Sequence, residues 1–181
     1  MVAELDVTGV RIAVEVTVAA EPGLVWDLLA DVGRVGEWSP ECDRASWLGL
    51  GGAPRAGARF SGHNRLGAWE WTVTCVVTEA ERPRVFAWVV LYGEEGAGHD
   101  PGEWTERASS FWRYDLDPGA AGGTVVRESF THGPGGSGLR TAVARAPDKA
   151  DLIVSRRREQ LRSNMLETLA GMKAAAESGL H

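Results

Sequence analysis

The chain has 181 residues, of which 44% are hydrophobic and 24% charged, as in an ordinary globular protein. Its formal net charge of −6 argues against nucleic acid as a partner, because phosphate binding requires a concentrated basic surface. Cys42 and Cys75 have no metal-ligand or redox spacing, and neither a signal-peptide pattern nor a membrane-length apolar run is found. We therefore expect one cytoplasmic domain over residues 1–181, without a membrane span, as a monomer or homodimer.

The first predicted element is a half-buried strand over residues 10–18, because apolar and polar side chains alternate along it. Its apolar face carries Ile12, Val14, Val16 and Val18. Glu21-Pro22-Gly23 then opens a short helix, since proline is favoured in a first helical turn. A second short helical segment over residues 35–38 is stopped by Ser39-Pro40.

Six further strands are predicted from β-prone runs that end at turn residues. They span residues 44–50, 58–65, 69–78, 85–92, 109–116 and 124–130. Asp117-Pro118-Gly119 and Gly122-Gly123 join the last two as a hairpin. Residues 93–102, rich in glycine and acidic side chains, are expected to form an exposed irregular loop. The order favours an antiparallel meander of about seven strands.

The last predicted element is a long helix over about residues 148–177, capped by Asp148 after Pro147. Its apolar stripe consists of Leu161, Met165, Thr168, Leu169, Met172 and Ala176. A sheet of about seven strands is roughly 30 Å wide, whereas a helix is about 10–12 Å across. The sheet must therefore curl around the helix. This predicts an α+β helix-grip fold, with two short helices between the first and second strands.

Several short motifs support this fold through a resemblance to a known family. They are Trp38-Ser39-Pro40-Glu41-Cys42, Phe60-Ser61-Gly62-His63-Asn64, Trp112-Arg113-Tyr114 and Gly123-Thr124-Val125-Val126. With the order of elements, they make residues 10–177 similar to the START-related SRPBCC superfamily, and more closely to its bacterial polyketide cyclase/dehydrase and lipid transport group. The resemblance implies a helix-grip fold with an internal cavity for an apolar ligand. It leaves the ligand and any reaction open, because fold does not determine function.

The candidate ligand contacts are an aromatic wall and a few polar side chains on faces predicted to point inward. The aromatic candidates are Trp38, Trp69, Trp71, Trp88, Trp112 and Tyr114. The polar candidates are Asn64, Glu128, Arg157 and Asn164. In an apolar pocket such groups orient a ligand, and a desolvated carboxyl has a raised pKa that suits it to act as an acid.

Three of these placements have a structural alternative. A strand register shifted by one residue puts Glu128 in solvent. Arg157 interrupts the apolar stripe of the long helix, so it either reaches into the cavity or lies at the sheet edge with its charge in water. Trp38 is either a lid contact at the mouth of the pocket or an ordinary core residue.

Signals for other functions are absent or incomplete. Gly133, Gly135 and Gly138 match a dinucleotide-binding pattern, but the surrounding βαβ unit is missing and Pro134 intrudes. The histidines at 63, 99 and 132 have no second ligand at a suitable spacing. We therefore expect no metal site and no cofactor.

Three hypotheses for function remain open. The first is a module that binds an apolar, aromatic or polycyclic small molecule or lipid. The second is a polyketide aromatase/cyclase or dehydratase in which Glu128, Tyr114 or Arg157 assists proton transfer. The third is a regulatory module with a vestigial pocket, whose outer surface binds another protein.

Overall fold

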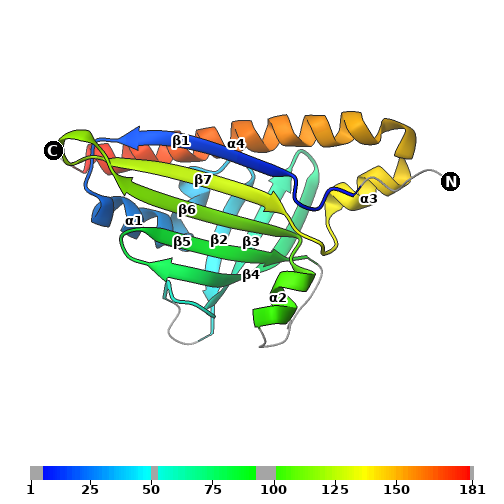
Figure 1. The fold of residues 1–181 in the computed structure, drawn as a ribbon, viewed down its shortest axis with the longest axis horizontal. Coiled ribbons are helices and arrows are strands. Elements are labelled where there is room, and N and C mark those ends of the chain that lie inside the picture. Colours follow the sequence, from blue (N-terminus) through cyan, green and yellow to red (C-terminus); the bar gives the residue numbers. More distant parts are fainter. Residues whose placement is uncertain (1–5, 50–52, 93–100, 180–181) are drawn as a thin grey trace.

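The computed structural model describes residues 6–49, 53–92 and 101–179, and within them one curved antiparallel sheet of seven strands wraps around a core (Figure 1). The strands are β1 (Arg11–Val18), β2 (Cys42–Leu48), β3 (Arg59–Leu66), β4 (Trp69–Glu81), β5 (Val85–Leu91), β6 (Ser110–Pro118) and β7 (Thr124–His132). Their order in the sheet is β1-β7-β6-β5-β4-β3-β2. The predicted seven-stranded meander is confirmed, with the first two strands of the chain at opposite edges.

Helices and 3-10 turns connect the strands and cover the sheet. They are α1 (Pro22–Ala30), η1 (Val32–Glu37), α2 (Pro101–Arg107), η2 (Ala120–Gly122), α3 (Gly138–Arg145), η3 (Pro147–Lys149) and α4 (Ala150–Ser178). The two short helices predicted between the first two strands are α1 and η1. Of the loop predicted over residues 93–102, residues 93–100 lie outside the described residues, and residues 101 and 102 begin the helix α2.

The 29-residue helix α4 confirms the predicted C-terminal helix, and its buried residues are those of the predicted apolar stripe. The predicted cap is wrong, however. Asp148 lies inside the turn η3, which Pro147 begins, and the N-cap of α4 is Lys149, without a side-chain hydrogen bond. Residues 150–160 contain no fully buried side chain. This first part of α4 extends beyond the sheet toward α3 (Figure 1).

The main hydrophobic core lies between the concave face of the sheet, α1 and α4. Bulges interrupt the strand pairing between Cys42 and Arg44 on β2 and between Val77 and Glu79 on β4. Such bulges bend a strand and increase its twist, which helps the sheet to curl. A smaller core on the convex face joins Val89 of β5 to Trp104 of α2. None of the helices in the described residues is long and apolar enough to cross a membrane.

The glycines of the apparent dinucleotide-binding pattern have a packing role. A Cβ atom at Gly133 would lie 2.1 Å from the carbonyl oxygen of Ala108, and one at Gly135 equally close to that of Arg107. Backbone hydrogen bonds run from Gly133 to Ser109 and from Gly135 to Ala108. Glycine is required here so that the chain after β7 can approach the chain before β6.

Candidate functional site

The concave face carries an aromatic cluster centred on Trp88. Its indole stacks on that of Trp112 across β5 and β6, with ring centroids 6.0 Å apart and an interplanar angle of 3°. Further rings contact Trp88 at centroid distances of 5.5 to 6.0 Å, namely those of Phe60, Phe86 and Tyr114. The predicted positions of Trp88, Trp112 and Tyr114 thus come together on one surface.

Trp88 lies near the middle of the sheet and yet remains partly exposed. On β5, Val89 and Leu91 of the convex face are buried, whereas Trp88 and Val90 of the concave face are only half-buried. Trp71 and Trp112, also on the concave face, are likewise half-buried. Solvent therefore reaches part of this aromatic surface, although its rings also pack against the main core. We call this partly exposed concave surface the cleft.

Glu128 lies on the concave face of β7 and is 3% exposed, so the register that would have put it in solvent is excluded. Its neighbour across the strands is Tyr114, whose hydroxyl donates to Oε1 at 3.2 Å. Oε2 has no hydrogen-bond partner within the described part of the chain. Burial raises the pKa of Glu128 to about 8, although the hydrogen bond from Tyr114 lowers it in part. At neutral pH this carboxyl is therefore mostly a neutral acid.

Burial also raises the pKa of the Tyr114 hydroxyl well above its usual value, and the charge of Glu128 adds to this effect. The two cysteines respond in the same way. Burial raises the pKa of Cys42 to about 11 and that of Cys75 well above the usual value for a thiol. Neither cysteine is a thiolate at neutral pH, so nucleophilic thiol chemistry is not favoured at this surface.

A second polar group lies where α4 meets the connector between η1 and β2. Nη1 and Nη2 of Arg157 donate to the two carboxylate oxygens of Glu41 at 2.8 and 2.5 Å. Nδ2 of Asn164 donates to the same carboxylate at 2.9 Å, and Gln160 accepts from Arg157 at 3.0 Å. The side chains of Glu41 and Arg157 are 13% and 23% exposed. Arg157 and Asn164, both predicted as site residues, thus meet at one carboxylate.

Trp38 ties the same connector to α4. It packs on Gly171, where an added Cβ atom would lie 3.0 Å from the Cβ atom of Trp38. The guanidinium of Arg34 lies 5.2 Å from the centroid of the Trp38 ring. Trp38 is half-buried against the main core, as the core-packing alternative predicts, and the role of a lid contact stays a prediction.

The remaining predicted residues differ in their placement. Asn64 is half-buried opposite Cys42, and its Nδ2 donates to the carbonyl of Gly62 at 3.4 Å. Trp69 does not belong to the wall, because it is 73% exposed. It is the first residue of β4 and pairs with Leu66 at the tip of the β3–β4 hairpin, where its indole is left in solvent.

Two residues near the cleft were not assigned from the sequence. Glu41 lies in a motif that carried the family resemblance, but its partners are 116 and 123 residues away along the chain, and no local pattern indicates them. His132 was considered only as a metal ligand. It is buried at the end of β7, and its Nδ1 has no hydrogen-bond partner among the described residues. Burial lowers its pKa, and the charges of Arg140 and Arg157 act in the same direction.

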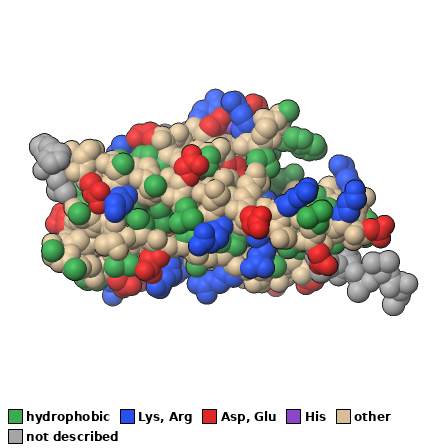
Figure 2. Space-filling model, turned by 90° about the horizontal axis from the view of Figure 1, so that it is seen from above, with side chains coloured by type: hydrophobic (Ala, Val, Ile, Leu, Met, Phe, Trp, Pro, Cys, Tyr) green, Lys and Arg blue, Asp and Glu red, His purple; other side chains and the backbone are tan. Residues whose placement is uncertain are grey.

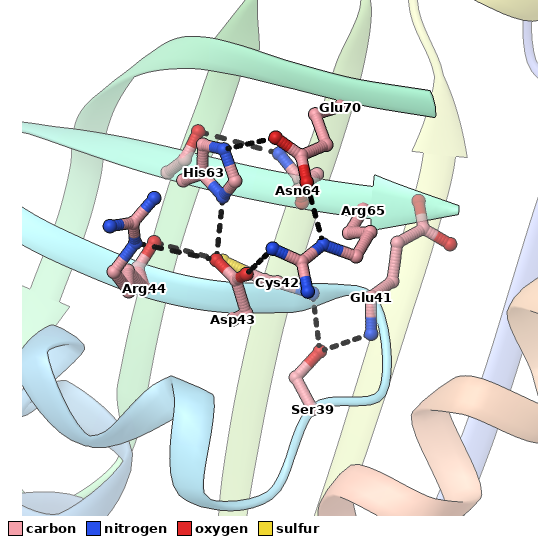
Figure 3. A network of polar contacts seen from close by, with 10 residues as sticks. Ser39, Glu41, Cys42, Asp43, Arg44, His63, Asn64, Arg65 and Glu70 are labelled. Atoms are coloured by element: carbon pink, nitrogen blue, oxygen red, sulfur yellow. Dashed lines mark hydrogen bonds and ion pairs between the residues drawn. The ribbon is translucent and has the colours of Figure 1, made fainter. Parts of the chain in front are cut away.

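A network on the convex side of β2–β4 supports the connector (Figure 3). Nδ1 of His63 lies 2.6 Å from Asp43, the residue bulged out of β2, and this hydrogen bond lowers the pKa of Asp43. Oγ of Ser39 accepts from the backbone N–H groups of Glu41 and Cys42. These contacts fix the backbone from which the carboxylate of Glu41 reaches α4. Among the described residues, no group of three or more His, Cys, Asp or Glu side chains is arranged to hold a metal ion.

A separate groove of about 430 Å³ lies outside the cleft, between β1 and α4. Its apolar lining includes Val16, Leu166 and Leu169, and charged side chains such as Lys173 border it. The molecule seen from above, along this side, shows hydrophobic side chains scattered among charged ones (Figure 2). Lys173 donates to the carbonyl of Thr17 at 2.8 Å and so bridges the groove.

Comparisons with known proteins agree with this architecture. The family model described as "Polyketide cyclase / dehydrase and lipid transport" matches residues 9–177. No curated protein matches the sequence significantly. Among solved structures, the polyketide cyclase-like protein Cgl2372 from Corynebacterium glutamicum is 28% identical, with a TM-score of 0.64. That alignment covers 96% of this chain and 94% of the other.

Two aromatase/cyclases are similar in fold. The ZhuI aromatase/cyclase from Streptomyces sp. R1128 is 22% identical, with a TM-score of 0.67, over 94% of this chain and 95% of that one. The di-domain aromatase/cyclase StfQ from the steffimycin biosynthetic pathway is 15% identical, also with a TM-score of 0.67. Its alignment covers 96% of this chain and 52% of StfQ, so this chain corresponds to about half of that protein.

Proposed function

Because the chain belongs to the polyketide cyclase / dehydrase and lipid transport family, we propose that it binds an aromatic or polycyclic small molecule against the concave face of its sheet. The observation that carries this proposal is the partly exposed stack of Trp88 and Trp112. Removing apolar surface from water contributes about 25 cal/mol per Å² to binding before the entropic cost of association is subtracted. Contacts between aromatic rings add about 0.5–1.5 kcal/mol each, which favours a planar aromatic ligand over a saturated one.

Isothermal titration calorimetry with a planar aromatic probe such as 2-acetonaphthone tests this proposal. Trp88→Leu is expected to weaken binding about tenfold, because it removes the central ring of the wall. Trp69→Leu, the same change at the exposed hairpin tip, is the matched control and should leave the affinity unchanged. Equal effects of the two substitutions, or no binding by the wild type, would contradict the proposal.

A second candidate function is catalysis by an aromatase/cyclase or dehydratase, and the buried acid Glu128 is the observation that favours it. In its neutral form the carboxyl can give a proton to the carbonyl or leaving hydroxyl oxygen of a bound ligand, and Tyr114 holds the other carboxyl oxygen in place. The aromatase/cyclase relatives support this reading by analogy of fold alone.

Incubation with a reactive polyketide mimic tests the catalytic candidate. The rate of cyclisation should fall strongly in Glu128→Gln, which keeps the shape and removes the acid, and less in Tyr114→Phe. If Glu128→Gln and Tyr114→Phe cyclise the mimic as fast as the Trp69→Leu control, the catalytic proposal is wrong. The third candidate, a regulatory module with a filled pocket, has less support, because Trp88, Val90 and Trp112 on the concave face are partly exposed. The cytoplasmic location and a monomeric or homodimeric state stay predictions from the sequence.

A further inference from the structure

Arg157 and Asn164 form a carboxylate-binding site on α4, and in this structure Glu41 fills it. Three N–H groups converge on one carboxylate, two from the guanidinium fork and one from the amide. A two-pronged contact between guanidinium and carboxylate is specific in geometry and stronger than a neutral hydrogen bond. The receptor atoms all belong to the helix, whereas the carboxylate comes from the connector.

This site lies beside the β2–β3 part of the concave face. The backbone of Glu41 accepts a hydrogen bond from Arg65 at the end of β3 and leads directly into Cys42, which faces Asn64 on the neighbouring strand. On the other side of the cleft, β7 passes from Phe130, which contacts the ring of Trp112, to His132. Phe130 and His132 therefore extend the row of rings from Trp112 toward Arg157, whose charge acts on His132.

The charges at this end favour an anion. His132 experiences the positive charges of both Arg140 and Arg157, and burial keeps its imidazole neutral at pH 7. Its Nδ1 is buried and has no hydrogen-bond partner among the described residues. An acidic group placed beside Arg157 would be attracted by its guanidinium group.

We propose that Arg157 and Asn164 bind the carboxylate of the ligand, which displaces Glu41 from the same three N–H groups. The ligand is then an aromatic or polycyclic carboxylic acid, with its rings on Trp88 and Trp112. One carboxylate replaces another, so the guanidinium of Arg157 stays paired throughout, and Glu41 regains its hydration. The inference rests on the proposed function, because it uses the same cleft for the rings.

The displacement also loosens the cleft edge. Glu41 and Trp38 are two contacts that tie the connector to α4. Release of Glu41 leaves the connector attached through Trp38 on Gly171. A carboxylic acid thus weakens the closure of the cleft as it binds, whereas a neutral aromatic ligand leaves the contact between Glu41 and Arg157 in place.

The test compares 2-naphthoate with 2-acetonaphthone, a neutral ketone of nearly the same shape, by calorimetry. The wild type should bind 2-naphthoate about tenfold more tightly. Arg157→Met should abolish this preference and retain binding of the ketone. Arg158→Met is the matched control, since it removes the same charge one residue away at an exposed position, and it should retain the preference.

Glu41→Gln tests the displacement itself. Without the competing carboxylate, 2-naphthoate should bind several-fold more tightly and the ketone as before. Asn164→Ala gives an independent check, with a several-fold loss for 2-naphthoate alone. Equal binding of the two probes by the wild type, or an unchanged preference in Arg157→Met, would overturn the inference and leave the proposed function standing. If neither probe binds, both fail.

Discussion

Two carboxyl groups of the molecule, Glu128 inside the sheet and Glu41 beside α4, differ in burial and in partners. Glu128 is buried, has Tyr114 as its hydrogen-bond partner and makes no ion pair with any described residue. Glu41 lies at the edge and receives a guanidinium and an amide. The comparison shows that two carboxyl groups of the same residue type have different hydrogen-bond partners and different burial, and that burial raises the pKa of Glu128.

The largest expected effect concerns the pH dependence of stability. The pKa of Glu128 is about 8 in the folded protein against 4.5 for an ordinary glutamate, so the unfolded chain releases the proton first as the pH rises. The contribution of Glu128 to stability should therefore fall between pH 5 and pH 8, by up to about 1.4 kcal/mol per pH unit, whereas that of His132, whose pKa is lowered, rises with pH. Glu128→Gln should lose this slope.

Urea unfolding at pH 5 and pH 8 measures the difference between the two proteins. Trp69→Leu carries no titratable change and should follow the slope of the wild type. A Glu128→Gln variant whose stability falls with pH as steeply as that of the wild type would show that Glu128 is ionised in the folded protein.

An intermediate effect is expected at the edge of the cleft. Arg157→Met leaves Glu41 without its cationic partner. The loss for a fully buried pair is about 3–5 kcal/mol, but both side chains here are partly exposed, so about 1–2 kcal/mol is expected. Chemical unfolding at pH 7 checks this value. Arg158→Met should change the free energy of unfolding by less than about 0.5 kcal/mol. An equal loss of stability in Arg157→Met and Arg158→Met would show that the ion pair with Glu41 does not stabilise the fold.

The smallest effect concerns the hydroxyl of Tyr114. Tyr114→Phe removes the donor to Glu128 and should cost about 1 kcal/mol, because a buried carboxyl oxygen loses its partner. The pKa of Glu128 should rise further, since that hydrogen bond lowers it. Tyr92→Phe, the same change at an exposed tyrosine, is the control for urea unfolding. Identical urea midpoints for Tyr114→Phe and Tyr92→Phe would contradict a stabilising hydrogen bond between Tyr114 and Glu128.

The sequence was sufficient for the features that depend on local periodicity. The stripe of α4 follows from helical spacing, and the concave faces of β4, β6 and β7 follow from alternation, which also placed Glu128 correctly. The helices α2 and α3 were missed, because each has only seven or eight residues and glycines and prolines surround them. Short helices of this kind are stabilised mainly by tertiary contacts.

The candidate ligand site was only partly predictable, because the exposure of its residues and their long-range partners are not local features of the sequence. Alternation tells which face of β4 carries Trp69, but it does not tell that the hairpin tip extends into solvent. Glu41 was missed because its partners lie more than a hundred residues away, on a helix that approaches the connector only after folding. The exposure of a side chain and its pairing with a distant residue depend on how helices and strands pack together after folding. The spacing of residues along one helix or strand does not show this.

The central claim is that an aromatic ligand lies on Trp88 and Trp112. The most direct measurement is a nuclear magnetic resonance titration that follows the indole N–H signals of the eight tryptophans, assigned by single substitutions, during addition of an aromatic probe. The account predicts that the signals of Trp88 and Trp112 shift most and that the signal of Trp69 stays in place. Shifts confined to Trp69 and other exposed positions would contradict it.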